Sequence, residues 1–295
     1  MPKNLSRLCA ALAAGLCAIS CGKERAWDGP DWRPQQPPQR IVAGSVLAVE
    51  SLLEVISHNR LVGVHQIAAD ARYSLVADQA QGLPLLGASP EQLLSVRPDL
   101  VLVDAYTRAE TLALLGAANV PVIRTRDPHC FEDIEANLRL LGRVTHLDTE
   151  VDQLIVATTK ALQSMRQAGR GLNEWRILSL DGALHTYGEG SLFDVVTRTT
   201  GARNLAAEHG VGAFRKLDIE EVLAWRPDAL VMSGDAPADG GLPDWVMQCP
   251  GLDLLPCVAA GRIIYVPSRL LITTSHRLVE SVAFVQKQLL EWGKP

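Results

Sequence analysis

Short apolar runs alternate with amphipathic stretches along most of the chain. RIVAG (40–44) and LVGVH (61–65) have the length and composition of buried strands, and SVLAVESLLEVIS between them repeats apolar residues every three or four positions. The same alternation restarts at WRILSL (175–180) and continues to RIIYVP (262–267). Strands that alternate with helices of about 10–15 residues indicate βαβ units. The pattern therefore predicts an α/β fold with mostly parallel sheets.

One long amphipathic stretch, DTEVDQLIVATTKALQSMRQAG, separates the two alternating regions. Asp148 is a candidate N-cap for this helix, and Gly169 is a candidate stop. At 1.5 Å per residue, about 21 residues make a rod of roughly 30 Å. We therefore predict two Rossmann-like lobes, residues 40–147 and 171–295, joined by one backbone α-helix over residues 148–170 that limits their relative motion.

The segment EQLLSVRPDLVLV (91–103) is nearly repeated as EEVLAWRPDALVM (220–232). In each copy a glutamate opens a short helix, Pro98 or Pro227 closes it, and an apolar strand follows. Each copy taken alone is explained as a well-capped helix, turn and strand.

The two glutamates of the repeat stand in register. Ser89 and Asp218 are positioned to cap the two helices, so Glu91 and Glu220 fall in the first turns. There the helix dipole stabilises a carboxylate by about 0.3–1 kcal/mol. One such charge in each lobe favours a partner with pseudo-twofold symmetry.

The first residues have the pattern of an export signal. Lys3 and Arg7 precede LCAALAAGLCAI, an apolar run shorter than the about 20 residues that span a bilayer. The small residues of AISC resemble a lipobox, although Ala18 stands where leucine is usual. We expect residues 1–20 to be a lipoprotein signal peptide and Cys21 to be acylated; cleavage without a lipid is the alternative.

The polar, proline-rich composition of residues 21–39 predicts a disordered tether. Together with the lipid anchor, this tether would hold the rest of the protein on the periplasmic side of a bacterial membrane. We expect the protein to be a monomer. In an oxidising compartment Cys249 and Cys257 are candidates for a local disulfide, which would leave Cys130 as a buried, unpaired thiol.

Composition and motifs exclude several functions. The chain has 295 residues and a net charge of −5, without a basic stretch that would follow a nucleic acid. It contains no G-x-S-x-G, H-E-x-x-H or C-x-x-C motif. We therefore expect no catalytic residue, although a periplasmic chelatase-like enzyme of the same architecture remains an alternative.

Residues 40–290 resemble the helical-backbone (class III) substrate-binding proteins that serve ABC importers of ferric siderophores, haem and cobalamin. The resemblance rests on the two E-x6-P-D segments, on YGEGSLFDVVTRTTGARNLAA (187–207) and on GLDLLPCVAAGRIIYVP (251–267). It implies that a metal chelate binds between the lobes, that no cofactor or metal is resident, and that Glu91 and Glu220 contact the two permease subunits of an ABC permease dimer with its ATPase.

Ligands of open α/β sheets bind beyond the carboxyl ends of the strands. The candidate contacts are therefore residues of the loops that follow strands: Ser45, His65, Gln66, Tyr73, Tyr106 and Arg126 in the first lobe, and Asp181, His185, Tyr187, Phe214, Arg215 and Ser268 in the second. By the resemblance, Tyr187 and Phe214 face the cleft.

The identity of the ligand stays open at this point. A ferric siderophore is favoured because Arg126, Arg215 and Arg269 are available to an anionic chelate. Cobalamin would use Phe214 and Tyr187 as apolar walls. Haem is disfavoured because LPLLGAS, before Glu91, has no aromatic residue where the relatives place one. A bare zinc or manganese site is the further alternative, with four histidines near strand ends as candidate ligands: His65, His129, His185 and His276.

Overall fold

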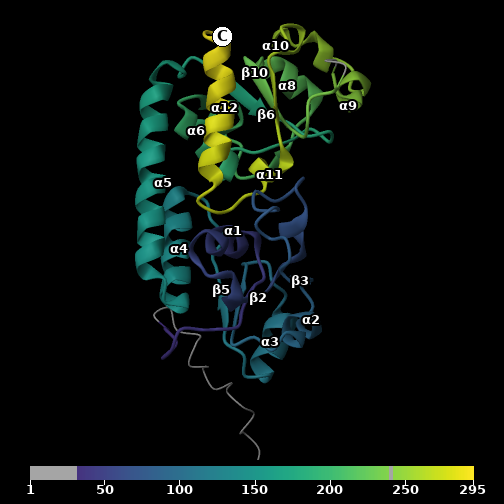
Figure 1. Cartoon of the computed structure of the whole chain (residues 1–295). Helices are drawn as coiled ribbons and strands as arrows, with labels where there is room; N and C mark the ends of the chain where they lie inside the picture. The colour runs from purple at the N-terminus through teal and green to yellow at the C-terminus, as the bar shows by residue number, and fades with distance from the viewer. Residues whose placement is uncertain (1–31, 239–241) are drawn as a thin grey trace, which may run out of the picture. The chain divides into compact units, whose positions relative to one another are not determined.

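Two parallel sheets organise the chain. The structure, a computed structural model, describes residues 32–238 and 242–295 (Figure 1). Within it, residues 34–295 form one unit. The first sheet has the strand order β3-β2-β1-β4-β5, with every neighbouring pair parallel. Its strands are β1 (Ile41–Ala43), β2 (Leu61–His65), β3 (Leu85–Leu86), β4 (Leu100–Val103) and β5 (Val122–Arg124).

The second sheet is also parallel and has the order β11-β10-β6-β8. Its strands are β6 (Arg176–Ser179), β8 (Arg203–Asn204), β10 (Ala229–Ser233) and β11 (Ile263–Val266). A separate antiparallel pair joins β7 (His185–Thr186) to β9 (Arg215–Lys216). The predicted α/β class with mostly parallel sheets is confirmed. The two-residue strands β3, β7, β8 and β9 were not predicted, because two residues show no periodicity.

Helices connect the strands and cover the sheets (Figure 1). In chain order they are α1 (Val46–Val55), α2 (Pro90–Ser95), α3 (Ala109–Ala117), α4 (Phe131–Thr145), α5 (Asp148–Ala168), α6 (Leu192–Thr200), α7 (Leu205–Glu208), α8 (Ile219–Trp225), α9 (Asp244–Gln248), α10 (Pro256–Ala259), α11 (Ser268–Leu271) and α12 (Leu278–Trp292). In the described part of the chain, no helix is long and apolar enough to cross a membrane.

The backbone helix α5 is present and has the predicted length. Gly169 ends it and donates its N–H to the Met165 carbonyl, as expected. The predicted N-cap is wrong: Leu147 occupies that position, and Asp148 is the first helical residue. The cause is His146, which adopts a left-handed conformation between α4 and α5 and turns the chain directly into the next helix.

Helix α5 does not stand alone. It lies along α4, a helix that the sequence analysis did not assign, and also packs on α6 and α12 (Figure 1). One buried apolar cluster contains Ile134 and Leu138 of α4, Ile155 of α5, and Trp175 and Leu289 of the second lobe. The rod between the sheets is therefore a helix bundle with a shared core.

A close backbone contact fixes the end of α5 to the second lobe. A Cβ atom added to Gly169 would lie 2.0 Å from the carbonyl oxygen of Thr200, so only glycine fits. The buried amide of Gln286 donates to the carbonyl oxygens of Met165 at 2.8 Å and Thr200 at 3.0 Å. The Gln286 side chain thus joins the C-terminal ends of α5 and α6.

The repeated segment builds the same hydrogen-bonded clasp in both lobes. In the first lobe, Asp99 accepts a bond from the Arg40 backbone N–H at 2.9 Å and donates its own N–H to the Arg40 carbonyl at 2.9 Å. The Arg40 side chain donates to the Arg97 carbonyl at 2.8 Å. The clasp thus ties the start of β1 to the start of β4.

Asp228, Arg176 and Arg226 repeat this arrangement in the second lobe. Asp228 accepts from the Arg176 backbone N–H at 2.9 Å and returns its N–H to the Arg176 carbonyl at 2.9 Å. The Arg176 side chain reaches the Arg226 carbonyl at 3.0 Å. Arg97 and Arg226 both have left-handed backbones, with φ of 48° and 50°. The repeat therefore has a structural role in each lobe, which the sequence analysis did not recognise.

The caps expected for the repeated helices are confirmed. The Ser89 hydroxyl accepts from the Gln92 N–H, with Pro90 in the first turn of α2. Asp218 forms a capping box with Glu221 at the start of α8.

The expected disulfide is not formed. Cys249 and Cys257 are free thiols in the structure, as is Cys130. Cys257 packs as an apolar core residue in the cluster around Leu230 and Val246, and burial raises the pKa of its thiol to about 11. Cys130 is half-buried at the N-terminal cap of α4, rather than fully buried as expected.

Three predictions for the N-terminal region lie outside the described residues. These are the signal peptide 1–20, the lipid anchor at Cys21 and most of the tether 21–39. They stay predictions.

Loss of either clasp carboxylate should destabilise the fold. We expect Asp228→Ala to lower the free energy of unfolding by about 2 kcal/mol, because it removes hydrogen bonds to a charged acceptor at a half-buried position. Asp99→Ala should cost less, because Asp99 is exposed. Chemical denaturation measures both values. The matched control is the exposed Asp78, and a loss at Asp78→Ala as large as at Asp228→Ala would contradict the clasp.

Candidate ligand-binding cleft

Two adjoining hollows lie at the carboxyl ends of the strands, where ligands of α/β sheets bind. The larger has a volume of about 400 Å³ and the smaller about 120 Å³. Asp127, Pro128 and Ile272 line both, so the two form one cleft. Because Asp127 follows β5 and Ile272 precedes α12, the cleft is bounded by both lobes.

The larger hollow has a mainly apolar lining with a few polar groups at its edge. Leu270, Leu271 and Ile272, from the end of α11, belong to this lining. Polar groups come from the last residues of β6 and β10, from the loop after β6 and from the N-cap of α6: Ser179, Ser233, Asp181 and Ser191. An apolar pocket with a small number of polar groups is typical of sites for small organic ligands and chelates.

Asp181 orients the imidazole of His185 at the edge of the larger hollow. The carboxylate accepts from the His185 backbone N–H at 2.9 Å and lies 3.0 Å from its Nδ1. These hydrogen bonds hold the pKa of Asp181 below its usual value, against the opposing effect of partial burial. With Nδ1–H donating to Asp181, the lone pair of Nε2 is available to a metal, as in carboxylate–histidine–metal arrangements.

Two aromatic rings pack next to His185. Phe214 stacks on His185 with ring centres 4.8 Å apart, and Tyr187 tilts against Phe214 at 5.4 Å. Phe214 is 56% exposed and Tyr187 is 38% exposed. Rings this large that remain exposed beside a cleft offer apolar surface to a ligand. The antiparallel pair β7 and β9 positions them, since His185 pairs with Lys216 and Thr186 with Arg215.

A polar chain crosses the cleft from the first lobe to the second. The Tyr106 hydroxyl donates to Asp127, and this bond raises the pKa of Tyr106. Asp127 lies 3.9 Å from Nε2 of His129, whose Nδ1 is 3.0 Å from the carbonyl oxygen of Gly190 at the start of the α6 segment.

Several of the predicted binding residues line the cleft. Ser45, Tyr106 and Arg126 line the smaller hollow, and Asp181 and Tyr187 line the larger. Ser45 is buried, and its hydroxyl is already used as the N-cap of α1, where it accepts a backbone N–H of the first turn.

The other predicted residues of the first lobe do not line either hollow. His65 is half-buried, its Nδ1 accepts from the Ile67 N–H, and burial lowers its pKa. Gln66 is exposed in the turn after β2. Tyr73 lies under the guanidinium of Arg72, 5.3 Å away.

In the second lobe, His185 and Phe214 form the stack beside the larger hollow, as described above. Ser268 lies outside both linings, with its hydroxyl 3.1 Å from that of Ser233.

Arg215 does not line either hollow. Its guanidinium pairs with Glu221 at 2.9 Å and lies over the Trp225 ring at 5.7 Å.

The prediction missed Asp104 and Asp127, which line the cleft in the loops after β4 and β5. The same rule of strand ends that selected Tyr106 and Arg126 would have found them. It also missed Ile272 and Thr274, for which the sequence has no comparable pattern, because the loop reaches the cleft only through the packing of α11 and α12.

A buried polar network joins the two lobes beside the cleft. Glu50 of α1 accepts bonds at 2.6 Å from the hydroxyls of Thr273 and Ser275, both in the loop before α12. Glu54, one turn further on, lies 3.2 Å from His276 Nε2 and pairs with Arg277 at 2.5 Å. The Glu54–Arg277 ion pair, with His276 beside it, therefore joins the two lobes.

Glu50 is the member of this network whose burial is energetically unfavourable. It is 1% exposed, and its Oε1 atom has no hydrogen-bond partner among the described residues. Burial raises its pKa, although the hydroxyls of Ser275 and Thr273 act in the opposite direction. The pKa of Glu54 is instead lowered, because His276 and Arg277 outweigh its own burial.

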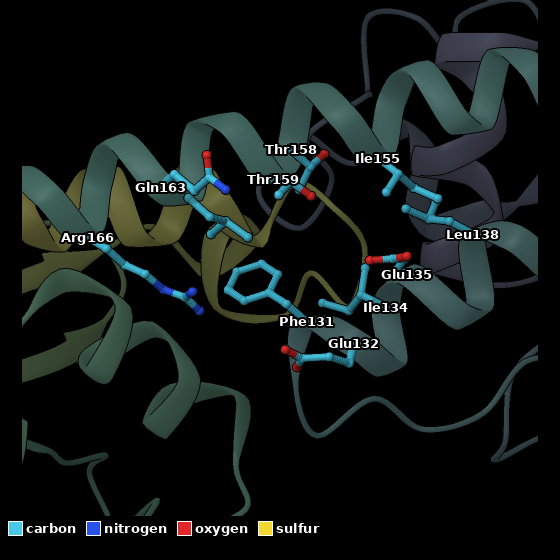
Figure 2. A pocket seen from close by; sticks show the side chains of 11 residues that line it. Phe131, Glu132, Ile134, Glu135, Leu138, Ile155, Thr158, Thr159, Gln163 and Arg166 are labelled. Carbon is cyan, nitrogen blue, oxygen red and sulfur yellow. The ribbon is translucent and has the colours of Figure 1, made fainter.

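Other hollows lie away from the cleft. Figure 2 shows one of about 150 Å³ between α4 and α5, with Phe131, Glu132 and Glu135 on the α4 side and Thr158, Gln163 and Arg166 on the α5 side. Another, of about 500 Å³, lies at the amino ends of the second sheet, next to the Asp228 clasp. Neither contains a predicted binding residue. Within residues 32–238 and 242–295, no group of three or more metal-binding side chains comes together.

Two α/β lobes on a helical backbone, with a ligand-sized cleft between the strand ends, define a solute-binding protein. The chain belongs to the periplasmic binding protein family, whose model matches residues 41–270. Membership of this family implies export to the periplasm.

Solved structures share the whole fold. The apo haem-binding protein RhuT from Roseiflexus sp. RS-1 is 25% identical, with a TM-score of 0.74 over 86% of this chain and 98% of that one. An Fe³⁺-hydroxamate transport protein from Saccharomonospora viridis is 20% identical, with a TM-score of 0.66 over 85% and 93% of the two chains. These relatives are solute-binding proteins, in agreement with the expected helical-backbone class.

Among curated proteins, the molybdate-binding protein MolA of Haemophilus influenzae is 23% identical over 169 residues. The match covers 50% of this chain and 48% of MolA, so the chain spans about half the length of this relative.

Replacing Glu50 by glutamine should change how stability depends on pH. A buried acid with a raised pKa holds its proton more tightly in the folded state, so its favourable contribution is lost as the pH rises through the folded pKa. A glutamine side chain at this position cannot ionise. We therefore expect Glu50→Gln to become more stable relative to the wild type as the pH rises from below 4.5, the usual glutamate pKa, to neutrality. Thermal melts across this range measure the difference, and a difference independent of pH would refute the assignment.

Proposed function

We propose that this protein is the substrate-binding component of an ABC importer, which captures a metal chelate between its lobes and delivers it to a permease dimer with its ATPase. The observation that carries the proposal is the Asp181–His185 pair with the Phe214 and Tyr187 rings at the edge of an apolar cleft of about 400 Å³. A ferric siderophore or a corrinoid presents both an apolar body and a metal centre to such a site.

The lack of a clustered set of metal ligands among the described residues argues for a chelate over a bare ion. The four candidate histidines are dispersed: His65 is bonded to its own loop, His276 to Glu54, His185 to Asp181 and His129 to Gly190. A bare zinc or manganese ion needs about four ligands that converge on one point.

Glu91 and Glu220 support the docking part of the proposal. Both are exposed in the first turns of α2 and α8. In the described part of the chain, neither makes a hydrogen bond or an ion pair that would explain its presence. The helices α2 and α8 precede β4 and β10, the strands that neighbour β1 and β6 in the two sheets. The two carboxylates therefore occupy equivalent positions, one in each lobe, and are available to basic residues of two permease subunits.

Cys21 would anchor the protein to the membrane through a lipid, so that the binding body stays near the permease. This part of the proposal rests on the sequence pattern around AISC.

Removing both docking carboxylates should separate binding from transport. We expect the Glu91→Ala/Glu220→Ala variant to bind the chelate like the wild type, while uptake falls about tenfold or more, because each lost charge-assisted contact is worth about 1.5–3 kcal/mol. Uptake of a labelled chelate in cells measures transport, and titration of the purified protein measures binding. The matched control, Glu110→Ala/Asp244→Ala, removes first-turn acids from α3 and α9. Normal uptake by the docking variant would exclude this role.

The nature of the ligand is tested by fluorescence titration. Trp245 lies against Gly182, next to Asp181, and provides a reporter near the cleft. We expect saturable quenching by a ferric siderophore or cobalamin and none by zinc or manganese salts. His185→Ala or Phe214→Ala should weaken binding by about tenfold, the lower range for a lost metal-site partner, whereas Tyr73→Ala should have no effect. A response to the bare metal salts alone would instead identify a metal-ion receptor.

A further inference from the structure

The charge of the cleft indicates which chelates it accepts. Among the described residues that line its two hollows, three are carboxylates, Asp104, Asp127 and Asp181, and one is a guanidinium, Arg126. The remaining titratable groups of the lining are the phenols of Tyr106 and Tyr187 and the imidazole of His129. With neutral histidine, the lining has an excess of negative charge.

In the described structure, none of these carboxylates is paired with a lysine or an arginine. Asp104 accepts from the Tyr106 backbone N–H and the Thr107 hydroxyl, both at 3.0 Å. Asp127 accepts from the Tyr106 hydroxyl and has His129 at 3.9 Å. Hydrogen bonds from neutral donors stabilise the ionised form of a carboxylate without cancelling its charge.

Asp181 is the best-defined of the three charges. It accepts from the backbone N–H groups of Ala183 at 2.8 Å and His185 at 2.9 Å, and its pKa is lowered. It is therefore ionised at neutral pH, and the imidazole of His185 beside it adds a positive charge only when protonated.

The arginines that would attract an anion are placed elsewhere. Arg215 is occupied by Glu221 and Trp225, and the Arg124 guanidinium donates to the Ala105 carbonyl at 2.6 Å. Arg269 does not line either hollow. The expectation that Arg126, Arg215 and Arg269 together bind an anionic chelate is thus not supported by their positions.

We propose that the cleft selects a metal chelate of neutral or positive net charge, and that Asp104 and Asp127 are the residues that exclude anionic ones. This inference rests on the proposed function. Like charges within a cleft of low polarity repel more strongly than in water, because the field is less screened. An oxyanion such as molybdate also needs several N–H donors that converge on it, and Arg126 is the one guanidinium in the described lining.

The test compares ferric chelates of different net charge. Calorimetric titrations of the full chain would use a cationic ferric trihydroxamate, ferrioxamine B, a neutral one, ferrichrome, an anionic ferric tricatecholate, ferric enterobactin, and sodium molybdate. We expect the cationic and neutral chelates to bind at least about tenfold more tightly than either anion, a difference of about 1.4 kcal/mol. Added salt should weaken the cationic chelate and leave the neutral one nearly unchanged.

Isosteric variants assign the effect to the two residues. Asn keeps a carbonyl acceptor for the bonds from Tyr106 and Thr107, so Asp104→Asn/Asp127→Asn should fold normally, as near-ultraviolet circular dichroism verifies. We expect the affinity ratio of cationic to anionic chelate to fall by about tenfold, the same 1.4 kcal/mol. Asp78→Asn, which removes an exposed carboxylate outside the cleft lining, should leave the ratio unchanged.

The outcomes distinguish this inference from the proposed function. Tight binding of ferric enterobactin or molybdate by the wild type, or an unchanged ratio in a folded double variant, would overturn the charge selection while leaving a solute-binding function in place. Failure of every chelate to bind, whatever its charge, would overturn the proposed function and this inference with it.

Discussion

The hydrogen-bonded clasp between an aspartate and the start of a neighbouring strand is the interaction on which both lobes depend. Asp99 and Asp228 each hold the start of a central strand through a backbone N–H and C=O: those of Arg40, directly before β1, and of Arg176, the first residue of β6. Because parallel strands run in one direction, fixing their amino ends also fixes where their carboxyl ends stop. The loops that line the cleft start from those ends. A contact at the amino ends of the strands therefore supports the cleft at their carboxyl ends.

A second constraint relates the two lobes. The buried network between α1 and the loop before α12 sets Glu50 and Glu54 against Thr273, Ser275, His276 and Arg277. Breaking such a buried network leaves charges without partners, which is costly. Together with the shared core of α4 and α5, it opposes large changes in the width of the cleft. Limited motion of the lobes was expected from the stiffness of α5 and stays a prediction, to which these contacts add a physical reason.

The sequence was sufficient for elements with strong local patterns and insufficient where tertiary contacts decide. The apolar strands, the length of α5 and the caps at Ser89 and Asp218 follow from periodicity and capping preferences. The strands β7 and β9 form only because the chain brings two dipeptides together. The expectation that ligands bind beyond the carboxyl ends of strands located Tyr106, Arg126 and Tyr187. It did not predict which contacts each side chain makes. Arg215 illustrates this limit: Glu221 and Trp225, which its guanidinium contacts, are identified only by the fold.

Different parts of the chain form the scaffold and line the cleft, so the same fold can accompany different ligands. Related structures bear names that refer to haem or Fe³⁺-hydroxamate transport, and a curated relative refers to molybdate, so the scaffold does not determine the ligand. In this chain the repeated segment supplies the same three features to both lobes: a clasp, a capped helix and an exposed glutamate. Residues in the loops after β4, β5 and β6 line the cleft. In each of these three loops a carboxylate, Asp104, Asp127 or Asp181, stands shortly beyond the end of the strand, where a substitution changes the charge of the cleft without disturbing the clasp that holds the strands.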